Sequence, residues 1–436
     1  MKRIRWCAWL VVFVVFSFSS QLDAENALPE PITAENVSRL KLQANLPIQA
    51  GGQDLDVQWS PDGRTIAIAT KLGAQTFDLS KPIDKPGSVF SKGSWAKCVD
   101  YVPDRSVLVT CDSYNAIAWL WDRHSGEKLA TLANGSSVLE YARFSPNGRL
   151  LAVINGFENS IYIWGIDGGA DAIVPANARK IKLLKRLDHK SYPTDMSFSP
   201  DGSQLASIST DRTLRIWNLA SMEITSSQTY DDSIRALAYS PDGQWLALGL
   251  DTANGTQLKL LNLADASITR VLKPLKAVAT VNDISFSPDG KLLASAHNDG
   301  EIIIWDVHEG KAVHTIDDVS GLAWRATFNR DNTLLATLNF DQGVRIWGIG
   351  NSLALIPEPT LGLRAQAFVT QALNMRAEAG TKATKVMQLS TNTIVTLVDG
   401  PVQADNLTWW KVRTANGIEG WVVESVDGEE TLAPDY

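Results

Sequence analysis

Residues 283–307 read DISFSPDGKLLASAHNDGEIIIWDV. Ile284 and Phe286 alternate with polar residues and lead into Ser-Pro-Asp-Gly, which predicts a strand that ends in a tight turn. Proline presets φ at the first corner of such a turn, and glycine tolerates the positive φ that closes it. After the returning strand, residues 302–305 and 312–316 predict two more, so this stretch encodes four short antiparallel strands.

This unit recurs seven times along the chain. The proline of its turn, or the residue in that place, recurs every 41 to 54 residues, at Pro61, Pro103, Pro146, Pro200, Pro241, Pro288 and Arg330. A four-stranded unit cannot cover both of its faces alone, so successive copies must pack on one another. A period in the low forties is typical of propeller blades. The sequence therefore predicts an all-β fold with a seven-bladed β-propeller over residues 39–350.

Most copies end in a tryptophan followed by a small or polar residue. The dipeptides that begin at Trp121, Trp164, Trp217, Trp305 and Trp347 resemble the ends of WD repeats, and Phe77 and Leu261 occupy the matching places in the other two copies. The resemblance implies a WD-repeat β-propeller with hydrogen-bonded structural residues, to which it assigns His189, Asp211, Trp217, Asp299, Trp305, Asp341 and Trp347. A TolB-like propeller, which uses similar turns, is the alternative architecture.

The start of the chain carries an export signal. Residues 1–24 combine a basic start, a 13-residue apolar run and small residues, which predicts a signal peptide cleaved near Ala24, or alternatively near Ser20. The apolar run is shorter than the roughly 20 residues that span a bilayer, so we expect no transmembrane segment in the mature chain. The protein is expected to be periplasmic, in the cell envelope or extracellular. Residues 25–38 form an N-terminal segment, and residues 39–46 are expected to close the seventh blade.

Two cysteines remain after this processing. Cys98 and Cys111 are expected on the first two strands of one blade. If Tyr101 faces Leu108, the cysteines face each other as well, and exported proteins meet oxidants. A disulfide and a pair of buried thiols both fit this pattern.

The charge of the chain argues against one class of partner. The formal charge is −8, and removal of residues 1–24 takes away a net +2, which leaves −10. An acidic protein is repelled by the phosphate backbone, so we expect no nucleic-acid partner.

A second module follows a linker expected over residues 351–365. Short alternating strands predict a small barrel over residues 366–427, followed by an acidic tail over residues 428–436. The stretches LNMR, WKVR and GWV resemble a bacterial Src-homology-3-like domain. Many members of that family bind cell-wall peptides or glycans, so the resemblance implies wall binding, with Trp409 and Trp410 as candidates. In so small a barrel some of these tryptophans must also serve as core.

Catalytic signals are scarce in this sequence. The five histidines fall in different repeats or at strand ends, whereas a zinc site needs three or four converging ligands, so no metal or cofactor is expected. Neither a nucleophile elbow nor a phosphate-binding glycine loop appears. We therefore do not expect an enzyme. The alternative is a propeller hydrolase or lyase with a carboxylate site in its central channel.

Aromatic residues instead gather in loops that share one face of the ring. These loops join strands two and three of a blade, or one blade to the next, and they contain Trp95, Tyr114, Phe157, Tyr192, Tyr230, Trp324 and Phe340. Aromatic side chains on a rigid scaffold are typical of recognition surfaces, although loop aromatics can also fold back onto their own blade. The sequence therefore predicts an exported, non-catalytic binding or scaffold protein. Its propeller recognises a protein or peptide, and its barrel is the candidate cell-wall binder.

Overall fold

The computed structural model describes most of the chain between residues 29 and 435. Its gaps are residues 49–55, 104–106, 113, 124, 134–137, 167–180, 254, 266–268, 275–278, 318–320, 341–342, 351, 356–365, 392, 415–416 and 427–428. The predicted signal peptide, residues 1–24, lies outside the described residues, as does most of the predicted linker.

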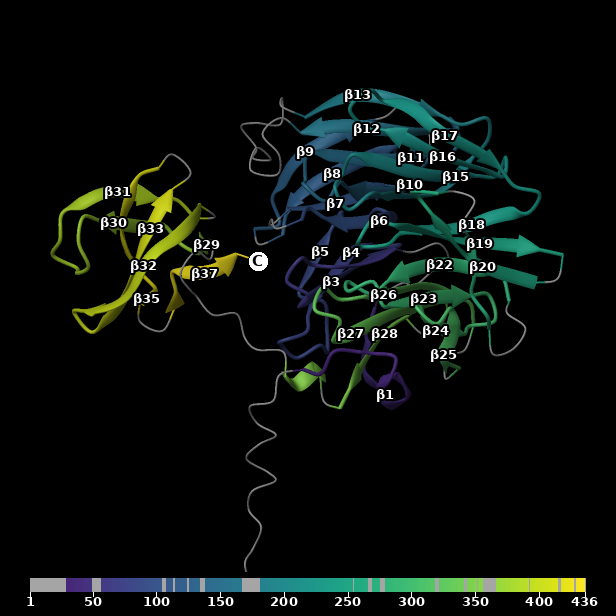
Figure 1. Cartoon of the computed structure of the whole chain (residues 1–436). Coiled ribbons are helices and arrows are strands. Elements are labelled where there is room, and N and C mark those ends of the chain that lie inside the picture. Colours follow the sequence, from purple (N-terminus) through teal and green to yellow (C-terminus); the bar gives the residue numbers. More distant parts are fainter. Residues whose placement is uncertain are drawn as a thin grey trace, which may run out of the picture.

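The described residues form seven four-stranded antiparallel sheets, which follow one another in chain order around a ring (Figure 1). Blades 1 to 4 consist of β2 (Val57–Trp59), β3 (Thr65–Thr70), β4 (Gly73–Asp78) and β5 (Ser88–Phe90); β6 (Ala96–Tyr101), β7 (Val107–Asp112), β8 (Ile117–Asp122) and β9 (Lys128–Ala133); β10 (Leu139–Phe144), β11 (Leu150–Asn155), β12 (Ser160–Ile166) and β13 (Ile181–Asp188); and β14 (Pro193–Phe198), β15 (Gln204–Ser209), β16 (Thr213–Asn218) and β17 (Glu223–Thr229).

Blades 5 to 7 repeat this order of strands. They consist of β18 (Ser233–Tyr239), β19 (Trp245–Thr252), β20 (Gly255–Asn262) and β21 (Thr269–Val271); β22 (Val281–Phe286), β23 (Leu292–His297), β24 (Ile302–Asp306) and β25 (Lys311–Ile316); and β26 (Ala323–Phe328), β27 (Leu334–Asn339), β28 (Gly343–Ile349) and β1 (Leu40–Leu46). The prediction of a seven-bladed propeller is therefore confirmed. Below, a BC loop joins the second and third strands of a blade, and a DA loop joins one blade to the next.

The repeated turn joins the first two strands of each blade and also packs against the neighbouring blade. In blade 6 the hydroxyl of Ser287 donates to Asp289 at 2.6 Å, and Gly290 adopts a φ of 71°. A Cβ atom on Gly290 would meet the ring of Pro241, the proline of the preceding turn, at 3.6 Å. The positive φ favours glycine at that place, whereas a Cβ atom at this distance would make only an ordinary contact with the proline.

The N-terminal strand completes the seventh blade. β1 pairs antiparallel with β28, from Leu40 opposite Ile349 to Leu46 opposite Val344. This pairing covers an edge that would otherwise be free, and it joins the start of the propeller to its end.

A short segment ahead of β1 also docks on the ring. It ends in the single-turn helix η1 (Val37–Arg39), and its Ile32 is buried against blades 6 and 7. The N–H of Ile32 donates to the carbonyl of Asn332, and the side-chain amide of Asn332 donates back to Ile32, both at 2.7 Å. Asn332 has a φ of 62°, where most other copies of the turn place glycine. The seventh turn departs from the repeat because its last residue holds this segment.

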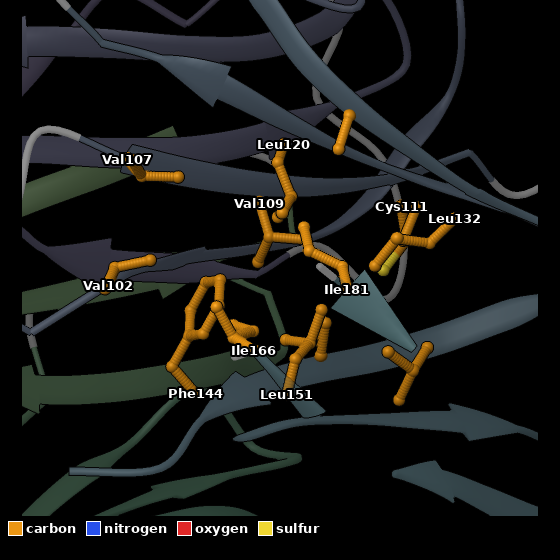
Figure 2. Close-up of a cluster of buried hydrophobic side chains, with 14 of the residues drawn as sticks. Val102, Val107, Val109, Cys111, Leu120, Leu132, Phe144, Leu151, Ile166 and Ile181 are labelled. Carbon is orange, nitrogen blue, oxygen red and sulfur yellow. The ribbon is translucent and has the colours of Figure 1, made fainter. Parts of the chain in front are cut away.

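The hydrophobic core lies between successive blades. Figure 2 shows one such layer, in which Val109 and Leu120 of blade 2 face Phe144 and Leu151 of blade 3. Each of these side chains is at most 6% exposed. Because every blade buries its faces against two neighbours, the ring is the smallest unit that covers them all.

Blade 2 contains a disulfide between its first two strands. The pairing places Tyr101 opposite Leu108 and Cys98 opposite Cys111. The two cysteines are joined, with their Cα atoms 5.1 Å apart, and both are fully buried. The bond therefore lies inside the layer between blades rather than on the surface.

The C-terminal module begins after helix η4 (Ser352–Leu355). Its main sheet comprises β29 (Gln366–Val369), β30 (Leu373–Arg376), β31 (Lys385–Leu389), β32 (Ile394–Ala404), β33 (Leu407–Thr414), β34 (Glu419–Val423) and β37 (Leu432–Asp435), and a small hairpin comprises β35 (Ser425–Val426) and β36 (Glu429–Glu430). The expected acidic tail is thus part of this domain. β37 pairs with β29 and buries Leu432, because apolar residues interrupt the acidic run.

Candidate binding face of the propeller

The WD-type polar residues of blade 4 lie inside the blade. The indole Nε1 of Trp217 donates to the hydroxyl of Ser207 at 2.8 Å, and Nε2 of His189 lies 2.8 Å from the same oxygen. Asp211 instead accepts the backbone N–H of Thr213 at 3.0 Å. Burial lowers the pKa of His189 to about 4, so its ring is neutral at physiological pH. These residues brace the blade and are not exposed to a ligand.

Blade 6 reaches a similar arrangement by another route. Trp305 Nε1 donates to the hydroxyl of Ser295 at 2.8 Å, and Nε2 of His297 lies 2.7 Å from that oxygen. This histidine comes from the end of β23 rather than from a DA loop, and its Nδ1 lies 3.0 Å from the carbonyl of Ala279. Asp299 accepts a backbone N–H two residues along the chain.

Blades 2 and 7 use threonine as the partner of the tryptophan. Trp121 Nε1 donates to Thr110 at 2.9 Å, and Trp347 Nε1 donates to Thr337 at 3.0 Å. Asp341, which the resemblance assigned to this set, lies outside the described residues. A tryptophan bonded to a buried hydroxyl of the neighbouring strand therefore recurs in four blades among the described residues.

Ionised side chains cross the central channel. Asp56, which is fully buried, accepts two hydrogen bonds from Arg143 of blade 3, at 2.7 and 3.0 Å. Nε of Arg325 of blade 7 lies 3.5 Å from the same carboxylate. Burial alone would raise the pKa of Asp56, but the two guanidinium groups outweigh it and hold this pKa below its usual value. The carboxylate thus ties three blades together.

Further channel carboxylates accept backbone N–H groups from the next blade. The pairs are Asp100 with Phe144 at 2.7 Å, Asp195 with Leu237 at 3.0 Å and Asp283 with Ala326 at 3.1 Å. Burial raises the pKa of Asp100 to about 7 and that of Asp195 to about 6. The alternative hypothesis of a propeller enzyme needs a cluster of carboxylates with shifted pKa values in the channel, and such a cluster is present. Each of these carboxylates, however, is engaged in bonds between blades.

Metal chemistry has no evident site in the part of the chain that the structure describes. No group of three or more histidine, cysteine, aspartate or glutamate side chains there is placed to hold a metal ion.

Four apolar side chains are exposed on the BC loops of four consecutive blades. Phe340 of blade 7 is 40% exposed, Leu72 of blade 1 is 45%, Tyr114 of blade 2 is 75% and Phe157 of blade 3 is 72%. We call these four residues the apolar arc. Three of them were predicted from the sequence, whereas Leu72 was missed because the search was restricted to aromatic residues.

Hydrogen bonds hold the loops of the arc in place. Asp112, at the end of β7, accepts the N–H groups of Tyr114 and Asn115 at 2.8 and 3.1 Å. It also accepts the hydroxyl of Ser94 from the preceding DA loop. The carbonyl of Leu72 accepts the N–H of Gly93 in that same DA loop at 3.2 Å. The loops of blades 1 and 2 are therefore connected and present one pre-formed surface.

Two of the predicted aromatic residues support the arc from beneath. Trp95 is half-buried, and its ring lies edge-on to that of Tyr114, with centroids 5.6 Å apart. Lys71 lies over the other side of this interaction, 5.5 Å from the Trp95 ring. Tyr192 is also half-buried, and a Cβ atom on Gly156 would lie 2.2 Å from its ring. Any side chain beside Phe157 at position 156 would therefore displace the ring of Tyr192.

The remaining two predicted aromatic residues pack back onto the ring. Tyr230 is half-buried against the core of blades 4 and 5, and Trp324 is half-buried against the core of blades 7 and 1. Neither belongs to the apolar arc, because each ring packs partly against these cores.

The predicted cell-wall residues of the barrel are core residues. Trp409 is 2% exposed and Trp410 is 5% exposed. Their indole N–H groups donate to the carbonyl of Ala404 at 3.0 Å and to Glu424 at 2.8 Å. The prediction that they contact a ligand is wrong, since a barrel this small needs both large rings to fill its interior.

Comparison with known families assigns both modules. Residues 181–218 and 223–256 match the family model of the WD domain, G-beta repeat, and residues 266–327 match that of the anaphase-promoting complex subunit 4 WD40 domain. Residues 371–427 match the bacterial SH3 domain. The chain carries WD repeats and a bacterial SH3 domain.

Characterised relatives resemble the propeller at low identity. The chain is 24% identical over 308 residues to a WD repeat-containing protein WDS homolog of Arabidopsis thaliana, which covers 67% of this chain and 55% of the relative. It is 24% identical to target of rapamycin complex subunit wat1 of Schizosaccharomyces pombe, over 57% of this chain and 76% of that protein. It is also 24% identical to mouse apoptotic protease-activating factor 1, over 67% of this chain and 26% of that protein. The chain thus spans about half the length of the Arabidopsis relative.

Within the described residues, no helix is both long enough and apolar enough to cross a membrane.

Proposed function

We propose that the protein is an exported binding protein whose propeller recognises a protein or peptide partner through the apolar arc. The observation that carries this proposal is the exposure of Phe340, Leu72, Tyr114 and Phe157 on consecutive blades. Folding gains nothing from apolar side chains left in water, and loops on a rigid scaffold are common sites of recognition. Aromatic anchors of this kind contribute much of the binding energy in protein interfaces.

The surroundings of the apolar arc favour the binding of a peptide over catalysis. The side chains of Asp112 and Asn155 accept the backbone N–H groups of Tyr114 and Glu158, which fixes the loops that carry Tyr114 and Phe157, so little backbone freedom is lost when a partner binds. The channel carboxylates are occupied between blades. This arrangement favours recognition over hydrolase or lyase chemistry.

Site-specific photo-crosslinking tests the arc directly. A photo-reactive phenylalanine derivative would replace Tyr114 or Phe157 in cells that produce the protein. The control position is Val271, which is 45% exposed on the outer strand β21. We expect the same discrete protein adduct from both arc positions and none from Val271. Absence of an arc adduct, or equal labelling from the control, would contradict the proposal.

We further propose that the C-terminal domain attaches the protein to the cell wall. The match of residues 371–427 to the bacterial SH3 domain supports this role. Residues 25–436, 25–356 and 360–436 would be incubated with insoluble peptidoglycan and centrifuged. The third polypeptide extends to the end of the chain because β37 pairs with β29. We expect the first and third to sediment, but not the second. Failure of the third to sediment would refute wall binding without affecting the arc.

A further inference from the structure

Blade 5 departs from the repeat at two diagonally neighbouring positions on adjacent strands. Leu261 lies opposite Leu246 in the strand pairing, just as Trp217 of blade 4 lies opposite Leu205. Two residues beyond Leu246, Leu248 stands where blade 4 has the hydroxyl of Ser207. The hydrogen-bonded tryptophan and serine are thus replaced by two leucines, which have no polar group to satisfy.

A cleft of about 320 Å³ opens at this place between blades 4 and 5. It is lined by Gln228, Thr229, Tyr230, Asp231, Asp232, Leu248, Leu250, Lys259, Leu261 and Thr269. The three leucines are each at most 5% exposed and provide an apolar lining. The volume lies at the small end of the range of about 300–1,000 Å³ that is usual for ligand pockets. A cleft of this volume has room for one side chain or a small molecule.

The polar part of the lining is acidic. Asp231 and Asp232 make no ion pair with any of the described residues, and Lys259 is the single cation in the lining. The lining itself holds these two carboxylates and one ammonium, and the guanidinium of Arg212 lies next to it. The guanidinium of Arg212 donates to the backbone carbonyl of Asp231 at 2.7 Å, which fixes the DA loop that carries both carboxylates.

An aromatic ring completes the cleft. Tyr230 is half-buried, and its hydroxyl donates to the side chain of Gln228 at 3.2 Å. A ring face beside carboxylates is a favourable environment for a cation, and buried leucines favour a hydrocarbon stem. These features together select a ligand with an apolar stem and a positively charged end.

We propose that this cleft is a second binding site, which takes an organic cation with an apolar stem, of the kind presented by an arginine or lysine side chain. The site is separate from the apolar arc, which lies on blades 7 and 1 to 3, so it goes beyond the proposed function. The cation pairs with Asp231 and Asp232, and its stem lies against Leu248 and Leu261.

Binding of small probes to the mature full-length chain tests the site. N-acetyl-arginine methylamide would be compared with the uncharged N-acetyl-norleucine methylamide by ligand-observed NMR. We expect the arginine probe to bind at least tenfold more tightly. Butylguanidinium, which lacks the backbone amides, would be compared with the arginine probe to distinguish the source of the ligand. Tighter binding of the arginine probe indicates a polypeptide ligand. Tighter binding of butylguanidinium indicates a small molecule. Equal binding of the arginine and norleucine probes would overturn the proposal.

Two variants provide independent controls. Leu248→Ser with Leu261→Trp restores the pair found in blade 4 and fills the cleft, so binding of the arginine probe should be lost. Asp231→Asn with Asp232→Asn retains the shape of the cleft and removes the negative charge, so it should weaken binding of the arginine probe at least tenfold. This second test does not depend on whether the filled variant folds. Unchanged binding in the charge variant would place the cation elsewhere and refute the site.

Discussion

The interior of the propeller and its BC-loop face use side chains in opposite ways. Inside, Asp56 and Trp217 are buried polar groups, and each is bonded to partners from another strand or blade. On the face, Tyr114 and Phe157 are apolar groups left largely exposed. The interior arrangement follows from the need to satisfy buried polar groups. The arrangement of the face has no such explanation, and this difference is the reason why we propose it as the binding surface.

The contrast predicts that interior changes alter stability and leave the face intact. The largest effect is expected for Asp56→Ala, because it leaves Arg143 and Arg325 without their shared buried carboxylate. We expect a loss of about 3–5 kcal/mol in the free energy of unfolding, measured by urea denaturation. Asp317→Ala, at an exposed position, should change it by less than about 0.5 kcal/mol. If the two variants were equally stable, the channel pairs would not hold the ring together.

The disulfide should have the next largest effect. Cys98→Ala with Cys111→Ala removes a cross-link between residues 13 positions apart. Loss of this constraint on the unfolded chain should lower stability by about 3 kcal/mol. Urea denaturation of the variant and of the reduced wild type should give similar midpoints below that of the oxidised protein. A midpoint unaffected by reduction would show that the covalent bond contributes nothing.

Loss of one interior hydrogen bond should cost less. Trp217→Phe retains an aromatic ring but removes the donor to Ser207, with an expected cost of about 1–2 kcal/mol in thermal or urea unfolding. Trp119→Phe is the matched control, since Trp119 is half-buried and outside the Trp–hydroxyl pairs. A smaller effect for Trp217 than for Trp119 would contradict a bracing role for this bond.

The buried carboxyl group of Asp100 should make the stability of the protein depend on pH. Its pKa of about 7 in the folded protein exceeds the usual value of 3.8, so folding favours the protonated form. This contribution is fully present below about pH 4 and is lost as the pH rises through 7. Asp100→Asn should therefore raise the melting temperature at pH 8 by about 2 °C and change it less at pH 5. A larger gain at pH 5 than at pH 8 would reverse the sign and refute this assignment.

The face should show the smallest change in stability and the largest change in binding. Tyr114→Ala with Phe157→Ala removes exposed rings, so the free energy of unfolding should stay within about 0.5 kcal/mol of the wild type. The photo-reactive residue would be placed at position 72, on the neighbouring BC loop. The yield of the partner adduct should be at least tenfold lower in the double variant than in a protein that retains Tyr114 and Phe157. A stability loss of several kcal/mol would instead make these rings part of the fold.

The fold could be read from the sequence because its signals are local and repeated. The Ser-Pro-Asp-Gly turns and terminal tryptophans define a blade without knowledge of distant contacts, and Tyr114, Phe157 and Phe340 follow from their places in the repeat. Other features depend on tertiary neighbours. The docking of Ile32 on Asn332 and the burial of Trp409 and Trp410 are decided by segments far away in the sequence or by the limited volume of the barrel.

The cleft illustrates a different limit. Leu261 is visible in the sequence as a departure from the repeat, but whether a cleft forms beside it depends on Leu248 of the adjacent strand and on the neighbouring blade. A departure from a repeat shows where a cleft can form. Whether it does form depends on the side chains of the neighbouring strands and blades.

The most direct test of the binding face is amide hydrogen exchange of the full chain, with and without the partner identified by crosslinking. We expect slower exchange at the BC loops around Leu72, Tyr114 and Phe157, with no change at the Ser-Pro-Asp-Gly turns on the opposite face. Protection of those turns or of the outer strands, with none at the BC loops, would contradict this expectation.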